Sequence, residues 1–184
     1  MTFDELRIRA EAASRRAEEA YHRLTDRYDS FLEQERSTRV SRRRFSTLVD
    51  RIRQSGAPYG AHTAVFRDDG RVLLVRHDDV DRWVLPGGGV DRGEVFRETA
   101  RRELAEEAGV EASYEGLAMV TRVQLSTRGA STWGVLPVFE ARADGTVLDV
   151  SDPDGEIVAA DWFETLPADT RDREDLLELR SRRG

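Results

Sequence analysis

The first part of the chain carries one apolar stripe at helical spacing. Residues 2–36 contain no Pro or Gly, and apolar or small residues recur three or four positions apart, at Phe3, Leu6, Ala10, Ala13, Ala17, Ala20, Leu24, Tyr28 and Phe31. This spacing predicts a single long amphipathic helix. Four consecutive positions of the stripe are alanine, so a partner helix could approach closely.

A second amphipathic helix is predicted over residues 39–54, with Val40, Phe45, Leu48, Val49 and Ile52 on one side. The two helices would form a helical hairpin that must bury its stripe, either on the rest of the chain or on a second subunit. Ser55-Gly56-Ala57-Pro58-Tyr59-Gly60 has the composition of a linker. We therefore expect an N-terminal arm, 1–56, for packing or dimerisation, and a catalytic domain, 57–184.

After residue 60 the pattern changes to short strands. Strands are predicted at 61–67, 71–77, 83–85, 117–125, 133–141 and 157–163, and helices at 94–108 and 173–182. Asp68-Asp69-Gly70 predicts a hairpin turn, and Pro137 indicates an edge position or a bulge. This order predicts an α/β sandwich in which helices cover both sides of a mixed sheet.

Composition excludes several classes of site. The chain has no cysteine, which removes disulfides, thiolate metal sites and cysteine nucleophiles. No apolar run approaches the roughly 20 residues that span a bilayer, and no signal peptide is evident, so we expect a cytoplasmic protein without a membrane partner. Every basic residue is Arg, as in a high-GC genome or a salt-adapted cell. The arm holds 13 Arg against 10 acids, whereas the rest holds 16 against 26.

Candidate chemistry lies in the glycine run 87–89 and the helix that follows it. Glu103 and Glu107 are one helical turn apart, and Glu106 lies beside them. Three carboxylates on one side of a helix repel one another, so this arrangement favours a bound cation. Carboxylate oxygens are the ligands that Mg²⁺ and Mn²⁺ prefer, and such ions assist the hydrolysis of diphosphates.

The fixed positions between 88 and 110 are similar to the Nudix box. They are Gly88, Glu94 and the run Arg102-Glu103-Leu104-Ala105-Glu106-Glu107-Ala108-Gly109-Val110. The run Trp83-Val84-Leu85-Pro86-Gly87 resembles the usual entry to that box, and residues 60–182 follow the order of elements in the Nudix fold. The resemblance implies a Nudix-type α/β/α sandwich that hydrolyses a nucleoside diphosphate linked to another moiety, with Mg²⁺ or Mn²⁺ as cofactor.

The resemblance also implies a role for each matching residue. Glu103, Glu106, Glu107 and the Gly87 carbonyl would bind metal, and Glu103 is a candidate general base. Arg102 would orient Glu103, while Gly88 and Glu94 would support the loop. Further candidates are Trp83, which flanks the glycines, and Glu156, which lies in an acidic loop with Asp152 and Asp154.

Three functions remain open from the sequence. The first is a small-molecule diphosphatase acting on a nucleotide-type substrate. The second is a nucleotide-binding sensor with weak turnover, and the third is an RNA 5′-end pyrophosphohydrolase whose arm holds RNA through Arg36, Arg39 and Arg42-Arg43-Arg44. A basic run is usually a solvated helix face, and no aromatic residues alternate with it, so nucleic acid is not the favoured partner. A homodimer is expected, since Nudix enzymes are often dimers.

Overall fold

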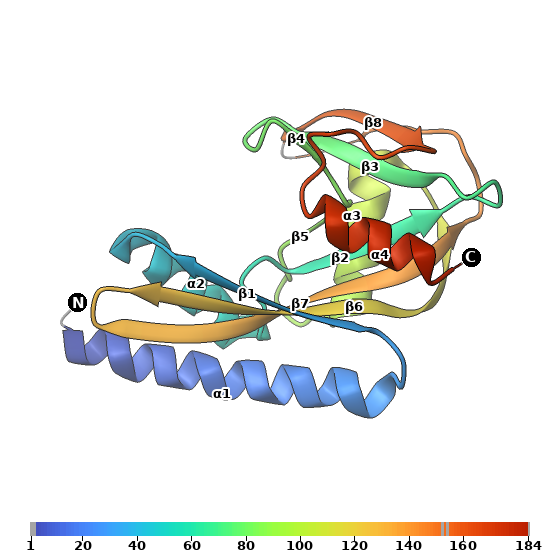
Figure 1. Ribbon diagram of the computed structural model, residues 1–184. Helices are drawn as coiled ribbons and strands as arrows, with labels where there is room; N and C mark the ends of the chain where they lie inside the picture. The colour runs from blue at the N-terminus through green and yellow to red at the C-terminus, as the bar shows by residue number, and fades with distance from the viewer. Residues whose placement is uncertain (1–2, 152, 154, 184) are drawn as a thin grey trace.

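The sheet at the centre of the molecule is mixed and carries helices on more than one side. The computed structural model describes residues 3–151, 153 and 155–183 (Figure 1). Within that part of the chain, eight strands form one sheet in the order β1-β6-β7-β2-β3-β4, with β5 paired to β2 and β8 paired to β3. The predicted α/β sandwich with a mixed sheet is therefore confirmed.

The elements from residue 61 onward follow the predicted order. The strands are β2 Ala61–Phe66, β3 Val72–His77, β4 Arg82–Val84, β5 Gly87–Gly88, β6 Ala112–Thr127, β7 Ala130–Ala143 and β8 Ile157–Phe163. The helices are α3 Phe96–Ala108 and α4 Arg173–Ser181. Gly109 ends α3 in the left-handed conformation, and its N–H donates to the Ala105 carbonyl at 2.9 Å.

The predicted helix over 2–36 is wrong in its last part. The helix α1 spans Phe3–Arg27, and the residues Leu32–Arg39 form strand β1. This strand pairs in parallel with β6, from Leu32 opposite Met119 to Arg39 opposite Ser126. It satisfies the backbone groups along an edge of β6 that would otherwise lie open, which a continued helix could not do.

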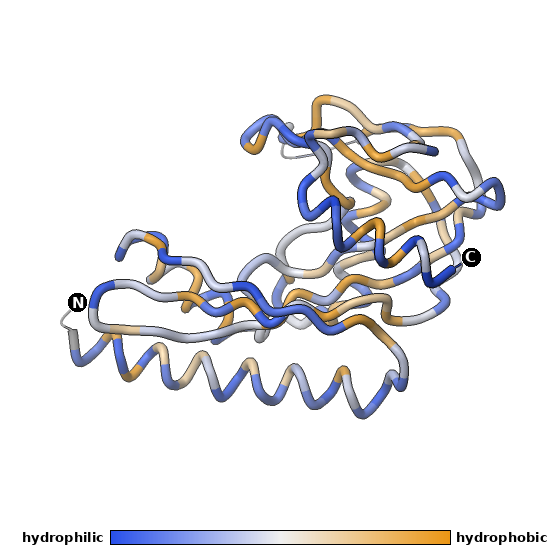
Figure 2. The backbone as a smooth tube through the Cα atoms, in the orientation of Figure 1, coloured by the Kyte–Doolittle hydropathy of each residue, from blue (hydrophilic) through white to orange (hydrophobic). Residues whose placement is uncertain are grey.

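The apolar stripe of α1 is buried within the chain. The helices α1 and α2, Arg42–Ser55, pack together although β1 separates them in sequence. The alanines of α1 at 10, 13 and 17 are at most 1% exposed, and they share one core with four buried residues of α2 (Phe45, Leu48, Val49 and Ile52) and with Val123 and Leu125 of β6. Figure 2 shows the apolar turns of α1 facing the sheet and the hydrophilic turns facing away. The sequence left open whether the rest of the chain or a second subunit covers this stripe. In the structure, residues of the same chain cover it.

The segment 55–60 is a packed bend rather than a free linker. Gly56 caps α2 in the left-handed conformation at φ 93°, and its carbonyl accepts from Val135 N–H at 2.9 Å. A Cβ at Gly56 would lie 2.4 Å from that of Ala20, so only glycine allows this approach to α1. The bend covers the free side of β7, and β2 joins that side only from Val138 onward. β7 is thus an interior strand between β6 and β2, and Pro137 lies one residue before the pairing with β2 begins rather than on an edge strand.

Candidate functional site

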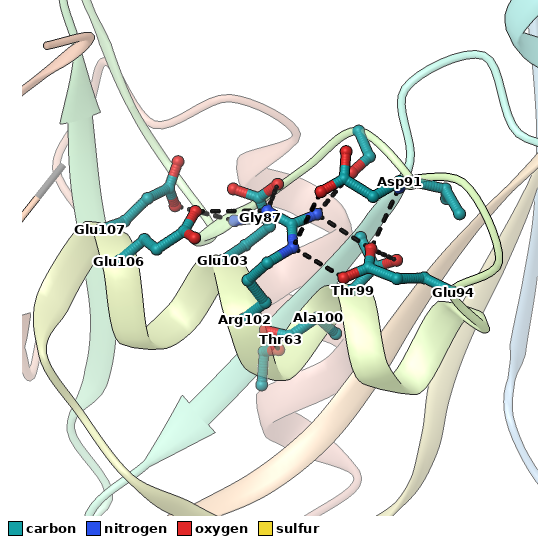
Figure 3. Close-up of polar contacts among 12 residues, drawn as sticks. Thr63, Gly87, Asp91, Glu94, Thr99, Ala100, Arg102, Glu103, Glu106 and Glu107 are labelled. Carbon is teal, nitrogen blue, oxygen red and sulfur yellow. Dashed lines mark hydrogen bonds and ion pairs between the residues drawn. The ribbon is translucent and has the colours of Figure 1, made fainter. Parts of the chain in front are cut away.

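The glutamates of α3 face the glycine loop that precedes the helix. Figure 3 shows Glu103, Glu106 and Glu107 along one side of α3, with Gly87 opposite them. The N–H of Val95 donates to Glu98 Oε2 at 3.1 Å, which fixes the start of the helix. A Cβ at residue 88 would lie 2.6 Å from the carboxylate of Glu103, so a larger residue there would displace that carboxylate.

Arg102 is the centre of the polar network. Its Nη1 donates to Glu103 Oε1 at 2.8 Å and to Glu106 Oε2 at 3.2 Å. Its Nε donates to Glu94 Oε1 at 2.8 Å, and its Nη2 donates to Glu94 Oε2 at 3.0 Å, a bidentate pair. Nη2 also donates to the Gly89 carbonyl at 2.9 Å. One guanidinium thus ties the helix, the loop and two candidate metal ligands together.

Glu94 holds Arg102 in place and remains ionised. Besides the two bonds from Arg102, its Oε2 accepts from Thr99 Oγ1 at 2.8 Å and from the Asp91 N–H at 3.0 Å. The hydrogen bonds from Arg102, helped by those from Thr99 and Asp91, lower the pKa of Glu94 to about 2 against the opposing effect of burial. This carboxylate therefore stays charged near neutral pH.

Glu103 has the opposite electrostatic character. Its side chain is only 14% exposed, and burial is the main cause that raises the pKa of this carboxyl above its ordinary value. The charges of Glu106 and Glu94 raise the pKa further, while Arg102 opposes them. A raised pKa makes Glu103 a better proton acceptor than an exposed glutamate.

Glu107 is fixed by the backbone of the loop. Glu107 is only 7% exposed, and its Oε2 accepts a hydrogen bond from the Gly87 N–H at 2.9 Å. Gly87 adopts φ 154°, and a Cβ there would lie 2.5 Å from the Ala61 carbonyl oxygen on β2. Close packing against β2 therefore sets the position of Gly87 and, through it, that of Glu107.

The donor chemistry fits a hard divalent cation. Three carboxylates and the carbonyl of a loop glycine are oxygen donors of the kind that Mg²⁺ and Mn²⁺ prefer. In this arrangement Arg102 supplies the positive charge that Glu103 and Glu106 share. Among the described residues, no three carboxylate or imidazole side chains form a ready-made ligand cluster. A cation would share Glu103 and Glu106 with Arg102.

Two further candidates lie away from this network. The carboxylate of Glu156 contacts His77 Nε2 at 2.9 Å, although its loop is joined to α3 by a bond from Ser151 N–H to the Glu106 carbonyl at 3.1 Å. Asp152 and Asp154 lie outside the described residues. Trp83 packs edge-on against Phe163, with ring centroids 4.7 Å apart.

Sequence reasoning missed several supporting contacts. Thr99 and the Gly89 carbonyl complete the shell around Glu94 and Arg102. The Nε2 of Gln54 donates to the Val90 carbonyl at 3.4 Å, so the end of α2 contacts the same loop. Nothing in the spacing of Gln54 relative to the glycines could have predicted that contact, since it depends on how the arm folds back.

A family comparison agrees with the geometry of this region. The family model of the NUDIX domain matches residues 57–178. In the described part of the chain, no helix is long and apolar enough to cross a bilayer.

Curated relatives match over part of the chain. A putative 8-oxo-dGTP diphosphatase of Bacillus subtilis (strain 168) is 36% identical over 88 residues, 47% of this chain and 59% of the relative. The 8-oxo-dGDP phosphatase NUDT18 of Mus musculus is 39% identical over 100 residues, 53% of this chain and 28% of the relative. An RNA pyrophosphohydrolase of Caulobacter vibrioides (strain NA1000 / CB15N) is 53% identical over 49 residues, 25% of this chain and 28% of the relative. The chain thus spans less than two thirds of each of these relatives.

Solved structures share the fold. A UDP-X diphosphatase superposes with a TM-score of 0.50 at 25% identity, covering 66% of this chain and 60% of that one. A NUDIX hydrolase of Nitrosomonas europaea superposes with a TM-score of 0.50 at 20% identity, covering 68% of this chain and 72% of that one. The second likeness concerns the fold alone.

Proposed function

Because this chain belongs to the NUDIX domain family, we propose that it is a metal-dependent hydrolase that cleaves a diphosphate linkage in a nucleoside diphosphate joined to another moiety. The observation that carries this proposal is the arrangement of Glu103, Glu106 and Glu107 opposite the glycine loop, with Arg102 between two of them and Glu94. Such a network concentrates acidic oxygen donors where a diphosphate and its counter-ion can meet.

In this proposal Glu103, Glu106, Glu107 and the Gly87 carbonyl hold Mg²⁺ or Mn²⁺. Bound there, such an ion would neutralise phosphate oxygens and lower the pKa of water. Glu103 accepts the proton of the attacking water, a role to which its raised pKa is suited. Arg102 holds Glu103 and Glu106 in position, and Glu94 holds Arg102, so the helix and loop keep their geometry through the reaction.

The substrate is proposed to be a free nucleotide or nucleotide conjugate. The names of two curated relatives support this class, since they describe a putative diphosphatase of 8-oxo-dGTP and a phosphatase of 8-oxo-dGDP. One of the solved structures is a UDP-X diphosphatase. The compounds in these names all contain a nucleoside with a diphosphate group, and they differ in what is attached to that group. We therefore place 8-oxo-dGTP first in a panel that also holds dGTP, ADP-ribose and UDP-sugars.

The test is hydrolysis of that panel with Mg²⁺ or Mn²⁺, followed by chromatography of the products so that cleavage at any linkage is seen. We expect turnover of at least one nucleoside diphosphate derivative that stops when EDTA removes the metal. Binding of nucleotides without turnover of any of them would instead support a sensor and contradict the hydrolase.

A further inference from the structure

The exposed side of α2 carries a line of cationic and polar residues. The side opposite the buried residues of α2 presents Arg43, Arg44, Thr47, Arg51 and Gln54, all of them exposed. At 100° per residue, these five positions fall within about 100° of one another around the helix axis. They therefore form one stripe along the helix, which we call the α2 stripe.

The positive charge of the α2 stripe is not neutralised within the protein. Asp50 is the acidic residue of α2, and it pairs with Arg9 and Arg53. In the chain as described, no acidic side chain pairs with Arg43, Arg44 or Arg51. The stripe thus presents three guanidinium groups to solvent.

The position of these arginines opposes the local preference of the helix. The first turn of α2 holds no acidic residue and begins with Arg42-Arg43-Arg44, whereas the partial positive charge of a helix N-terminus favours acidic side chains there. Both the helix end and the arginines attract anions. A sequence that breaks a local rule in this way indicates a function outside the stability of the helix.

The α2 stripe ends at the candidate active site. Gln54, its last member, donates to the Val90 carbonyl at 3.4 Å, and the neighbouring Gly89 carbonyl accepts from Arg102 at 2.9 Å. From Arg43 to Gln54 the helix rises about 17 Å. A substrate with a single nucleoside has no further phosphate that could reach the far end of this line, whereas an oligonucleotide does.

We propose that the α2 stripe binds the phosphate backbone of a single-stranded RNA whose 5′-triphosphate enters the site between α3 and the glycine loop. This inference rests on the proposed hydrolase function and extends its substrate class. Guanidinium groups pair with phosphate oxygens in a bidentate manner, and contacts with phosphates carry no information about the bases. The stripe therefore binds RNA without regard to its base sequence, and binding weakens as salt rises.

The experiment measures binding of an 8-nucleotide RNA with a 5′-triphosphate by fluorescence anisotropy, over a series of salt concentrations. The stripe variant combines Arg43→Ala, Arg44→Ala and Arg51→Ala. The matched control combines Arg15→Ala, Arg23→Ala and Arg142→Ala, three exposed arginines outside α2, and removes the same charge. Circular dichroism and thermal melting establish that both variants fold.

We expect the Kd for this RNA to rise roughly tenfold or more in the stripe variant at low salt and to change less than about twofold in the control. We also expect the slope of log K against log salt to become shallower by about 2, the value for three lost contacts with single strands. Equal weakening in both variants would overturn the proposal, as would RNA that binds the wild type no better than GTP does.

Measuring hydrolysis as well as binding distinguishes the RNA-binding role of the α2 stripe from the hydrolase function on which it rests. With Mg²⁺ present, the ratio of kcat/KM for the triphosphorylated RNA to kcat/KM for the mononucleotide is expected to fall about tenfold in the stripe variant. Absence of turnover with every substrate, together with stripe-dependent RNA binding, would overturn the hydrolase proposal and support the stripe.

Discussion

At the scale of single residues, Glu94 and Glu103 have different electrostatic properties although both accept hydrogen bonds from Arg102. Glu94 accepts hydrogen bonds from Arg102, Thr99 and Asp91 and has a lowered pKa, whereas Glu103 is buried and has a raised one. The first is suited to hold a fixed charge and the second to exchange a proton. Burial and hydrogen bonding, rather than residue type, produce this difference.

Gly88 tests whether the position of the Glu103 carboxylate matters. In Gly88→Ala the new Cβ would lie 2.6 Å from that carboxylate, so the side chain must move. We expect kcat/KM to fall about 100-fold, the scale associated with a misplacement of about 1 Å, with little change in Tm. Gly89→Ala is the control, because a Cβ at Gly89 meets nothing within 4 Å. Equal activity of the two variants would contradict the role given to Glu103.

Glu94 makes stability depend on pH in a defined window. Its pKa is about 2 in the folded protein against a reference value of 4.5, so its stabilising contribution is present above pH 4.5 and is lost as pH falls toward 2. Urea unfolding of wild type and Glu94→Gln should give a difference in unfolding free energy that is constant from pH 7 to 5 and shrinks below 4.5. A difference that grows on acidification would rule out this assignment.

Much of the site could be predicted because its residues are close in sequence. Glu103, Glu106 and Glu107 share a helix, and helical geometry alone places them together. Thr99 could have been noticed on the same helix, but the contact from Gln54 to Val90 could not, since it joins two segments through the tertiary fold. The packing of Trp83 against Phe163 likewise joins two segments that are far apart in sequence.

At the scale of elements, the N-terminal region shows where periodicity fails. The helical spacing continues through Tyr28 and Phe31, yet α1 ends at Arg27 and β1 follows. Within β1 only Leu32 is buried, so the strand has almost no hydrophobic pattern of its own. Its formation depends on pairing with β6, which no local signal reports.

Gly56 tests the joint between α2 and α1. Gly56→Ala would strain a positive φ and would also place a Cβ 2.4 Å from that of Ala20. Gly70→Ala is the matched control, since Gly70 also has a positive φ, of 82°, but faces open space. We expect Gly56→Ala to lower the free energy of unfolding by about 1–3 kcal/mol more than the control does, as overpacking predicts. If urea unfolding shows that both variants lose the same free energy of unfolding, α1 moves to accommodate the new Cβ and the close contact does not limit stability.

At the scale of the whole molecule, the arm and the sheet share a core. The stripe of α1 is covered by α2, β6 and β7 of the same chain, so it is not available to a second subunit. The homodimer stays a prediction that now depends on the family resemblance alone. Sedimentation velocity is expected to show a dimer, and a single monomer boundary at the highest attainable concentration would contradict it.

The measurement that tests the central claim most directly compares metal-dependent hydrolysis by wild type, Glu103→Gln and Glu111→Gln. Glu111 is an exposed glutamate just beyond α3, so its variant controls for the loss of one carboxylate. We predict that Glu103→Gln keeps the wild-type Tm within a few degrees but loses at least ~10²-fold in kcat, the scale of a lost acid–base role, while Glu111→Gln keeps full activity. Wild-type turnover by Glu103→Gln would contradict the account.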